Sequence, residues 1–182
     1  MPELASEPKL FDAYDRTRVS VEREMFRTPK DELSIIISRD SGSEMARQLV
    51  PGNGGSLNPN MLQNMQDNTF THFHPTGGNF STSDVMTGLS YGAAEIRAIM
   101  SDRTVSMNFE AAPTSLRGNP GAVYEFMNGE QAAIGKAYRT GVSNGTLSPP
   151  SDPATSGIWK SNFFVQQLVT RNSWIQYKET HR

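Results

Sequence analysis

The sequence predicts a single domain of α/β or α+β class, in which a mixed β-sheet is flanked by helices. Three observations support this expectation. The 182 residues suit one domain that is large enough to bury a core. Short β-branched or alternating segments take turns along the chain with longer segments of helical periodicity. No internal repeat is visible, which disfavours a solenoid or an array.

The first half of the chain begins with a helical pattern. Residues 8–26 carry apolar side chains at approximately helical spacing, so we expect a helix there. Residues 33–38 are short and rich in isoleucine, which predicts a buried strand. Residues 40–59 are rich in Gly, Ser, Asn and Pro, and we expect them to form a long loop. Asn58 and Pro59 have the residue types of a helix cap and first helical position, which predicts a short helix.

A strand, a turn and a helix are expected next. Residues 68–74 alternate like a strand, and the Pro and Gly residues of 75–78 predict a turn. Ser81 has the residue type and position of a helix cap, and the helix should run to about Tyr91. Residues 95–110 alternate on both sides of a polar turn, which predicts a hairpin.

The C-terminal part is expected to be helical with a short final strand. Residues 120–140 have the periodicity of a helix. Residues 143–157 are rich in Ser, Pro and Gly and predict a flexible linker. The chain would then end in a helix near 163–168 and a strand near 174–177. We therefore expect one domain over 1–182.

Composition narrows the function classes. The formal net charge of −2 provides no basic field, so we expect neither nucleic acid nor a membrane as a partner. No apolar run approaches the roughly 20 residues of a membrane helix, and the acidic N-terminus does not resemble a signal peptide. The protein is thus expected in the cytoplasm, or delivered into a host cell as an effector. The absence of cysteine leaves only His and carboxylate side chains to hold a metal.

Two of the three histidines form the centre of a candidate metal site. His72 and His74 are two residues apart on the expected strand, so both imidazoles should point to the same face. Asp84 lies in the first turn of the helix that Ser81 is expected to cap. Two imidazoles and one carboxylate are the usual protein ligands of a catalytic zinc ion, with a fourth position left for water. His72, His74 and Asp84 are therefore the predicted metal ligands.

Simpler explanations exist for each half of this pattern. Ser81 and Asp84 alone could be a capping box. The histidine pair alone could lie on the surface or belong to a cupin-type site. A cupin would need a Glu a few residues after His74, and none occurs before Asp84. The glycine turn between the halves supplies the chain reversal that a joint site needs, and Ser81 could serve as both cap and site residue.

The segment His72-Phe-His74-Pro75, followed after five residues by Ser81-Thr-Ser-Asp84, resembles the signature of the JAMM (JAB/MPN) zinc metalloproteases. Bacterial and phage versions are the most similar, and the likeness covers roughly residues 30–110. It implies a JAB/MPN-like (cytidine-deaminase-like) fold, zinc as the cofactor, and hydrolysis of peptide or isopeptide bonds. Protein or peptide substrates, including ubiquitin-like conjugates, are the partners it implies. Phe73 departs from the family, where a small polar residue is usual between the histidines.

The same resemblance implies a catalytic Glu just before an upstream apolar strand. Glu32 fits that position, although the following strand lacks the glycine that is common in the family. In the implied mechanism, Glu32 takes a proton from water and later passes it to the leaving amine, and the Ser81 hydroxyl stabilises the oxyanion. Thr71 or Asn79 could orient the ligands. Carboxylates that compete for the role of Glu32 are Asp31, Glu22, Glu24 and Glu44.

Two other functions stay open on sequence grounds. One is a non-catalytic metal-binding or scaffold module of a phage or toxin protein, in which Glu32 is an ordinary solvated carboxylate. The other is a DNA-associated relative, which the balanced charge disfavours. The residues themselves leave the substrate and the oligomeric state undetermined.

Overall fold

The computed structural model describes residues 7–25, 31–51 and 56–181, without the side chains of residues 7–13 and 51. Within these ranges, six strands form one mixed sheet in the order β2-β1-β3-β4-β5-β6. Every neighbouring pair is antiparallel except β3 and β4, which are parallel. The strands are β1 (Asp31–Ile37), β2 (Glu44–Pro51), β3 (Thr69–Phe73), β4 (Glu95–Ile99), β5 (Arg103–Asn108) and β6 (Gln176–His181).

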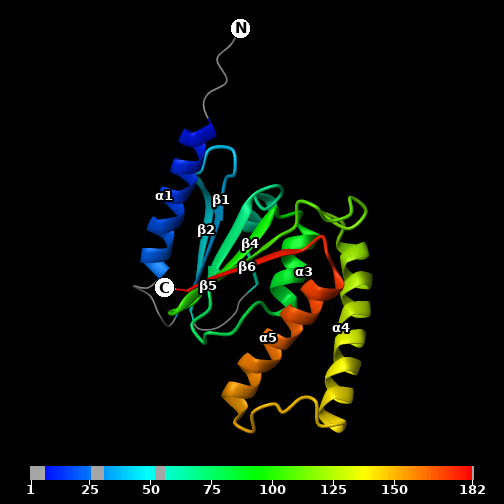
Figure 1. Cartoon of the computed structure of the whole chain (residues 1–182). Coiled ribbons are helices and arrows are strands. Elements are labelled where there is room, and N and C mark those ends of the chain that lie inside the picture. Colours follow the sequence, from blue (N-terminus) through cyan, green and yellow to red (C-terminus); the bar gives the residue numbers. More distant parts are fainter. Residues whose placement is uncertain (1–6, 26–30, 52–55, 182) are drawn as a thin grey trace.

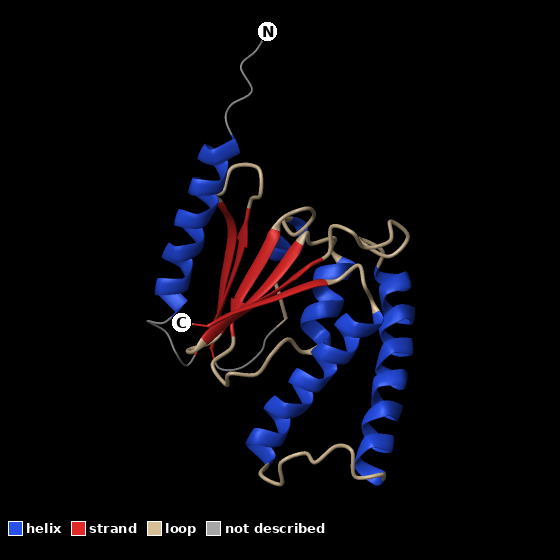
Figure 2. Cartoon of the chain, in the orientation of Figure 1, coloured by secondary structure: helices blue, strands red, loops and turns tan. Residues whose placement is uncertain are grey.

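Helices cover both faces of this sheet (Figures 1 and 2). Helix α1 packs on one face, and the other helices pack on the opposite face. The expected class, a mixed sheet flanked by helices, is therefore confirmed. No helix of the described residues is long and apolar enough to cross a membrane. The helices are α1 (Glu7–Met25), α2 (Pro59–Gln63), α3 (Thr82–Ser90), α4 (Pro120–Ser143) and α5 (Pro153–Arg171).

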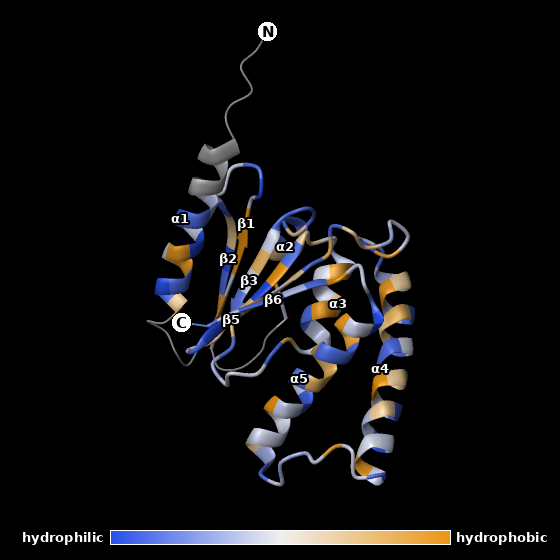
Figure 3. Cartoon of the chain, in the orientation of Figure 1, coloured by the Kyte–Doolittle hydropathy of each residue, from blue (hydrophilic) through white to orange (hydrophobic). Residues whose placement is uncertain are grey.

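Strand β1 is hydrophobic over most of its length because it is buried on both faces (Figure 3). Leu33, Ile35 and Ile37 pack against Val21 and Met25 of α1. The alternate residues of β1 face the other side, where a larger core extends beneath α2–α5. The two side-chain directions of each strand thus separate two cores, and the predicted metal ligands lie on the side of the larger one.

Strand β3 lies in the middle of the sheet and is followed by α3 and β4, which form a β-α-β unit with a parallel strand pair. Ser81 caps α3, as expected, and Gly88 brings the helix close to the sheet. A Cβ atom at Gly88 would lie 2.5 Å from Cγ2 of Ile96 and 3.2 Å from Cε2 of Phe109. The close approach of α3 to β4 and to Phe109, just after β5, therefore depends on a glycine at this position.

The prediction of a long loop over residues 40–59 is wrong for residues 44–51. Glu44–Pro51 forms the edge strand β2, which pairs with β1 along its length. A turn that contains Gly42 at φ 69° connects the two strands. Because β2 is an edge strand with many exposed side chains, its residues lack the apolar periodicity that marks a buried strand. The strand is formed because its backbone pairs with β1, and the composition of residues 44–51 does not indicate this pairing. Residues 52–55 of the expected loop lie outside the described residues.

Several other expected elements are confirmed, but boundaries near the C-terminus shift: the final strand expected near 174–177 is β6, Gln176–His181. The expected first helix, the 33–38 and 68–74 strands, the Asn58-capped helix, the 95–110 hairpin and the 120–140 helix are all present. The linker expected over 143–157 is shorter than predicted, because α5 already begins at Pro153. Asp152 caps this helix by accepting a hydrogen bond from the amide of Thr155, and Pro153 occupies the first helical position. The same residue types favour both a linker and a helix start, which explains the difference.

A glycine pair tests the packing of α3. We expect Gly88→Ala to destabilise the protein by about 1–3 kcal/mol, because the new methyl group must displace Ile96 or Phe109. Gly129→Ala is the matched control, since Gly129 lies within α4 and a Cβ there meets no atom within 4 Å. The control should stabilise the protein by roughly 0.5–1 kcal/mol through helix propensity. Urea unfolding of both variants measures the difference; a Gly88→Ala protein as stable as its parent would contradict the packing.

Candidate metal centre

His72 lies near the end of β3 and is completely buried. Its ring stacks on Phe70, with 4.7 Å between ring centroids, and meets the edge of His74 at 4.6 Å. Both ring nitrogens are buried, and neither has a hydrogen-bond partner. A buried imidazole without such partners is uncommon in proteins and calls for an explanation, such as an ion.

His74 follows β3 directly, and its backbone continues the hydrogen bonding to β4 for one more residue. Its backbone N–H donates to the carbonyl oxygen of Ile99 in β4 at 2.8 Å, so both imidazoles lie on the same side of the sheet. Nδ1 of His74 lies 2.8 Å from the carbonyl oxygen of Gly78. A carbonyl oxygen only accepts hydrogen bonds, so Nδ1 carries the proton and Nε2 presents a lone pair.

Asp84 is held in place by the N-terminus of α3. Its Oδ2 accepts hydrogen bonds from the backbone N–H of Ser81 at 2.6 Å and from the Ser81 hydroxyl at 2.8 Å. The Ser81 hydroxyl oxygen in turn accepts from the backbone N–H of Asp84 at 3.2 Å. The predicted capping box is therefore present. It also orients the carboxylate toward the two imidazoles.

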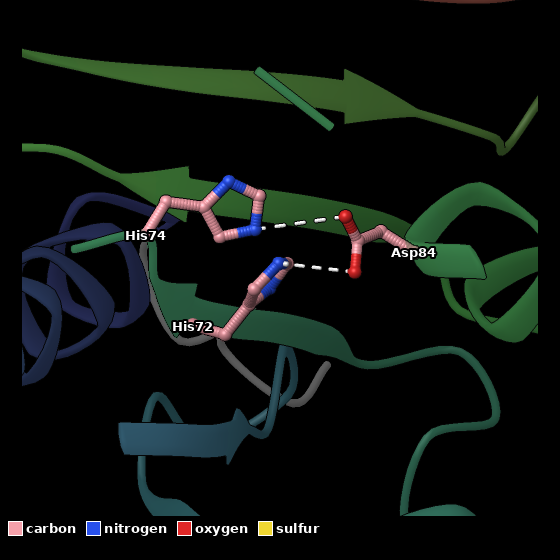
Figure 4. A group of neighbouring side chains, drawn as sticks. All are labelled: His72, His74 and Asp84. Atoms are coloured by element: carbon pink, nitrogen blue, oxygen red, sulfur yellow. Dashed lines mark ion pairs between the residues drawn. The ribbon is translucent and has the colours of Figure 1, made fainter. Parts of the chain in front are cut away.

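The three predicted ligands converge on one point (Figure 4). Nε2 of His72 lies 3.5 Å from Oδ1 of Asp84, and Nε2 of His74 lies 3.6 Å from Oδ2. Two ligand atoms on a tetrahedral zinc ion at 2.0–2.1 Å would be about 3.3–3.4 Å apart. The spacing therefore fits a shared ion after small side-chain movements.

The charge balance at this point also fits a cation. Burial and the neighbouring His72 lower the pKa of His74 to about 4, so the ring is neutral at pH 7. Its Nε2 lone pair then faces a carboxylate oxygen, and two acceptors that face each other repel unless a cation lies between them. Burial opposes ionisation of Asp84, but His72 outweighs it and holds the pKa of that carboxyl well below its usual range. Burial acts in the opposite direction on His72 and lowers its pKa. The carboxylates of Asp84 and Glu32 outweigh this effect, so the pKa of His72 is raised.

Glu32 lies on β1, on the same side of the sheet as the ligands. Ser34 pairs with His72 across β1 and β3, and Glu32 is two residues earlier, toward the His74 end. Glu32 and His74 line the same cleft. Of the competing carboxylates, Asp31 alternates to the opposite face of β1, and Glu22 pairs with Arg97 on that face.

Glu24 and Glu44 are also removed from the site, because both form ion pairs with Arg47 of β2. Arg47 pairs in register with Ile35, which packs against α1 on the other face of the sheet. Of Glu32 and its four competitors, Glu32 is therefore the carboxylate that lies at the cleft.

The cleft has a volume of about 1010 Å³ and lies between the metal-ligand cluster and the first turns of α5. Its described lining contains no Lys or Arg; the acidic groups in it are Glu32 and Asp84. The apolar part of the lining includes Leu57, Leu62, Phe70, Phe73, Tyr91 and Ile158.

The turn after His74 is held by three residues to which the sequence gave no role in the site: Ser161, Tyr177 and Arg103. The backbone N–H of Asn79 donates to the Ser161 hydroxyl at 3.2 Å, and Nδ2 of Asn79 donates to the Tyr177 hydroxyl at 2.9 Å. Arg103 donates to the carbonyl oxygen of Gly77 at 3.1 Å. Asn79 thus helps to hold the turn that contains Gly78, and a backbone hydrogen bond of Asn79 itself also acts on the pKa of His74. Thr71, the other residue suggested to orient the ligands, alternates to the opposite face from His72.

Comparisons with known proteins found no match: no protein-family model matches the chain, and neither a curated protein nor a solved structure matches it significantly. The resemblance to JAMM metalloproteases therefore depends on the motif residues alone.

The ligand cluster makes metal binding directly testable. We expect one divalent ion per chain, with zinc as the ion that the sequence predicts, and we expect loss of binding in the His72→Ala, His74→Ala double variant. Zinc at 100 times its dissociation constant should stabilise the parent by about 2.7 kcal/mol. His181→Ala is the control, because this third histidine is 72% exposed at the end of β6. Calorimetry and native mass spectrometry measure both effects; equal zinc binding by the double variant and the parent would refute the site.

Proposed function

We propose that the protein is a zinc-dependent hydrolase of amide bonds, of the JAMM class and with a JAB/MPN-like fold. His72, His74 and Asp84 would hold zinc, and Glu32 would act as the general base. One observation carries the proposal: the three ligand side chains converge, and the Glu that the resemblance implies lines the same cleft as His74 and Asp84. A metal-binding scaffold would need the ligands but not the carboxylate beside them.

The residues present fit zinc. Two imidazole nitrogens and one carboxylate oxygen are a common protein ligand set for a catalytic zinc site. Both ring nitrogens of His72 lack another partner, and the lone pair of His74 is directed by its bond to Gly78. When bound, zinc supplies a Lewis acid that polarises a carbonyl group and makes water more acidic.

Glu32 would perform the proton transfers. Its carboxylate accepts a proton from the attacking water and returns it to the nitrogen of the leaving amine, as a general base and then a general acid. Its partly buried position at the cleft, close enough to His72 to raise the pKa of that imidazole, supports this role. The scissile carbonyl would lie between Glu32 and the metal ligands.

The Ser81 hydroxyl is engaged by Asp84 in this structure. Its single hydroxyl proton is donated to Asp84, and its oxygen accepts from the amide of Asp84. In this arrangement the side chain positions the carboxylate. Stabilisation of an oxyanion by Ser81 would require the hydroxyl to exchange Asp84 for the substrate oxygen, so that role remains a proposal.

The substrate class proposed is a peptide or isopeptide segment of a protein. An extended chain could lie along the cleft between α2, the turn after His74 and the N-terminal turns of α5. The largely uncharged lining supports an uncharged segment near the scissile bond. Ubiquitin-like conjugates and bacterial or phage proteins are the substrates that the resemblance adds to this proposal.

Replacing Glu32 by Gln separates an enzyme from a binding module. The zinc-loaded variant should keep its metal and fold but lose at least about 10²-fold in hydrolysis, because Gln matches Glu in size but cannot accept a proton. Asp31→Asn is the matched control: it removes the same charge from the neighbouring residue on the opposite face of β1. Cleavage is measured by mass spectrometry on lysine-linked diubiquitin and on a peptide library prepared from a bacterial proteome.

The outcomes distinguish three cases. Loss of cleavage in Glu32→Gln, with activity retained in Asp31→Asn, supports the proposed base. Equal cleavage by Glu32→Gln and the parent rules out Glu32 as the base. Tight zinc binding by the parent without cleavage of either substrate set favours the scaffold function instead.

A further inference from the structure

Two buried polar groups without partners lie opposite each other in the sheet. Ser34 is 1% exposed, and its hydroxyl has no hydrogen-bond partner. Ser34 pairs in register with His72 across the antiparallel strands β1 and β3. His72 is fully buried, and its Nδ1 also lacks a partner. Directly opposed residues of an antiparallel pair have Cβ atoms about 4.5–5.5 Å apart on the same face, within reach of a hydrogen bond between these side chains.

We propose that Ser34 is the positioning residue of His72: its hydroxyl oxygen accepts a hydrogen bond from Nδ1–H and so directs Nε2 toward the metal. This inference rests on the proposed metal centre but not on the hydrolytic reaction. It assigns a role to a residue that the motif does not include.

The need for such an acceptor follows from the direction of the other nitrogen. Nε2 of His72 lies 3.5 Å from Asp84 and would be the ligand atom, so Nδ1 must carry the proton. A buried N–H without an acceptor is costly. The ring neighbours of His72 are Phe70, His74 and Phe80, which make aromatic contacts. His74 already has an equivalent acceptor in the carbonyl oxygen of Gly78, and the structure records none for His72.

Ser34 is the side chain best placed to meet this need. Rotation about its Cα–Cβ bond moves the hydroxyl oxygen among three staggered positions and leaves the backbone pairing intact. Glu32, the next polar residue on this side of β1, lies toward His74 and lines the cleft. Thr71 also has a buried hydroxyl without a partner, but it points to the opposite face of the sheet.

Because Ser34 and Thr71 lie on opposite faces of the sheet, Thr71 can serve as the control for Ser34. The proteins compared are the parent, Ser34→Ala, Ser34→Thr and Thr71→Val. The zinc affinity of each is measured by competition with a chromogenic chelator. The melting temperature of each metal-free protein is measured as well. Loss of the partner of a metal-bound histidine typically weakens binding about 10–100-fold, which we expect for Ser34→Ala. Ser34→Thr retains the hydroxyl and should therefore keep most of the zinc affinity of the parent. Thr71→Val removes an equally buried hydroxyl from the other face and should bind zinc as the parent does.

A second measurement does not depend on the variants. Long-range ¹H–¹⁵N NMR spectra of the zinc-loaded parent should show His72 with the proton on Nδ1, slow to exchange with water, and this protection should disappear in Ser34→Ala. Parent-like zinc affinity and an unchanged His72 signal in Ser34→Ala would overturn the role of Ser34 while leaving the metal centre intact. A parent that binds no zinc would overturn the metal centre itself, and the role of Ser34 with it.

Discussion

The candidate site depends above all on the register of β3 within the sheet. β3 pairs with β1 on one side, antiparallel, and with β4 on the other, parallel. A shift of one residue in either pairing would turn His72 and His74 to the face covered by α1. The same pairing places Ser34 opposite His72 and Glu32 toward His74. Four side chains from two distant segments of the sequence thus share one face, because the alternation of β1 matches that of β3.

The second constraint is the start of α3, where the Ser81–Asp84 hydrogen bonds both cap the helix and orient the carboxylate. The Ser81–Asp84 capping box satisfies backbone N–H groups that every helix start leaves unpaired. The same hydrogen bonds fix the Asp84 carboxylate between two imidazoles. Capping and ligand placement were competing explanations of these residues in the sequence, and the structure makes them compatible. The turn that links β3 to α3 is in turn held by Ser161, Tyr177 and Arg103.

Much of the fold and the ligand cluster could be predicted because the signals are local. The two histidines, the glycine turn and the cap lie within 13 consecutive residues, 72–84, so strand alternation and helix capping suffice to bring them together. Edge strand β2 could not be recognised, since its order comes from pairing with β1. The hydrogen bonds of Asn79 to Ser161 and Tyr177 join residues 82 and 98 positions apart, and no local pattern marks them. Ser34 reads simply as part of an apolar strand until the register shows what lies opposite it.

X-ray absorption spectroscopy at the zinc edge of the zinc-loaded protein tests the central claim most directly, because it reports the ligands themselves. The account predicts two imidazole nitrogens and at least one oxygen at about 2.0–2.2 Å. Replacing His72 and His74 by Ala should remove the imidazole scattering. A zinc spectrum without imidazole scattering in the parent protein, or one that the double replacement leaves unchanged, would contradict the account.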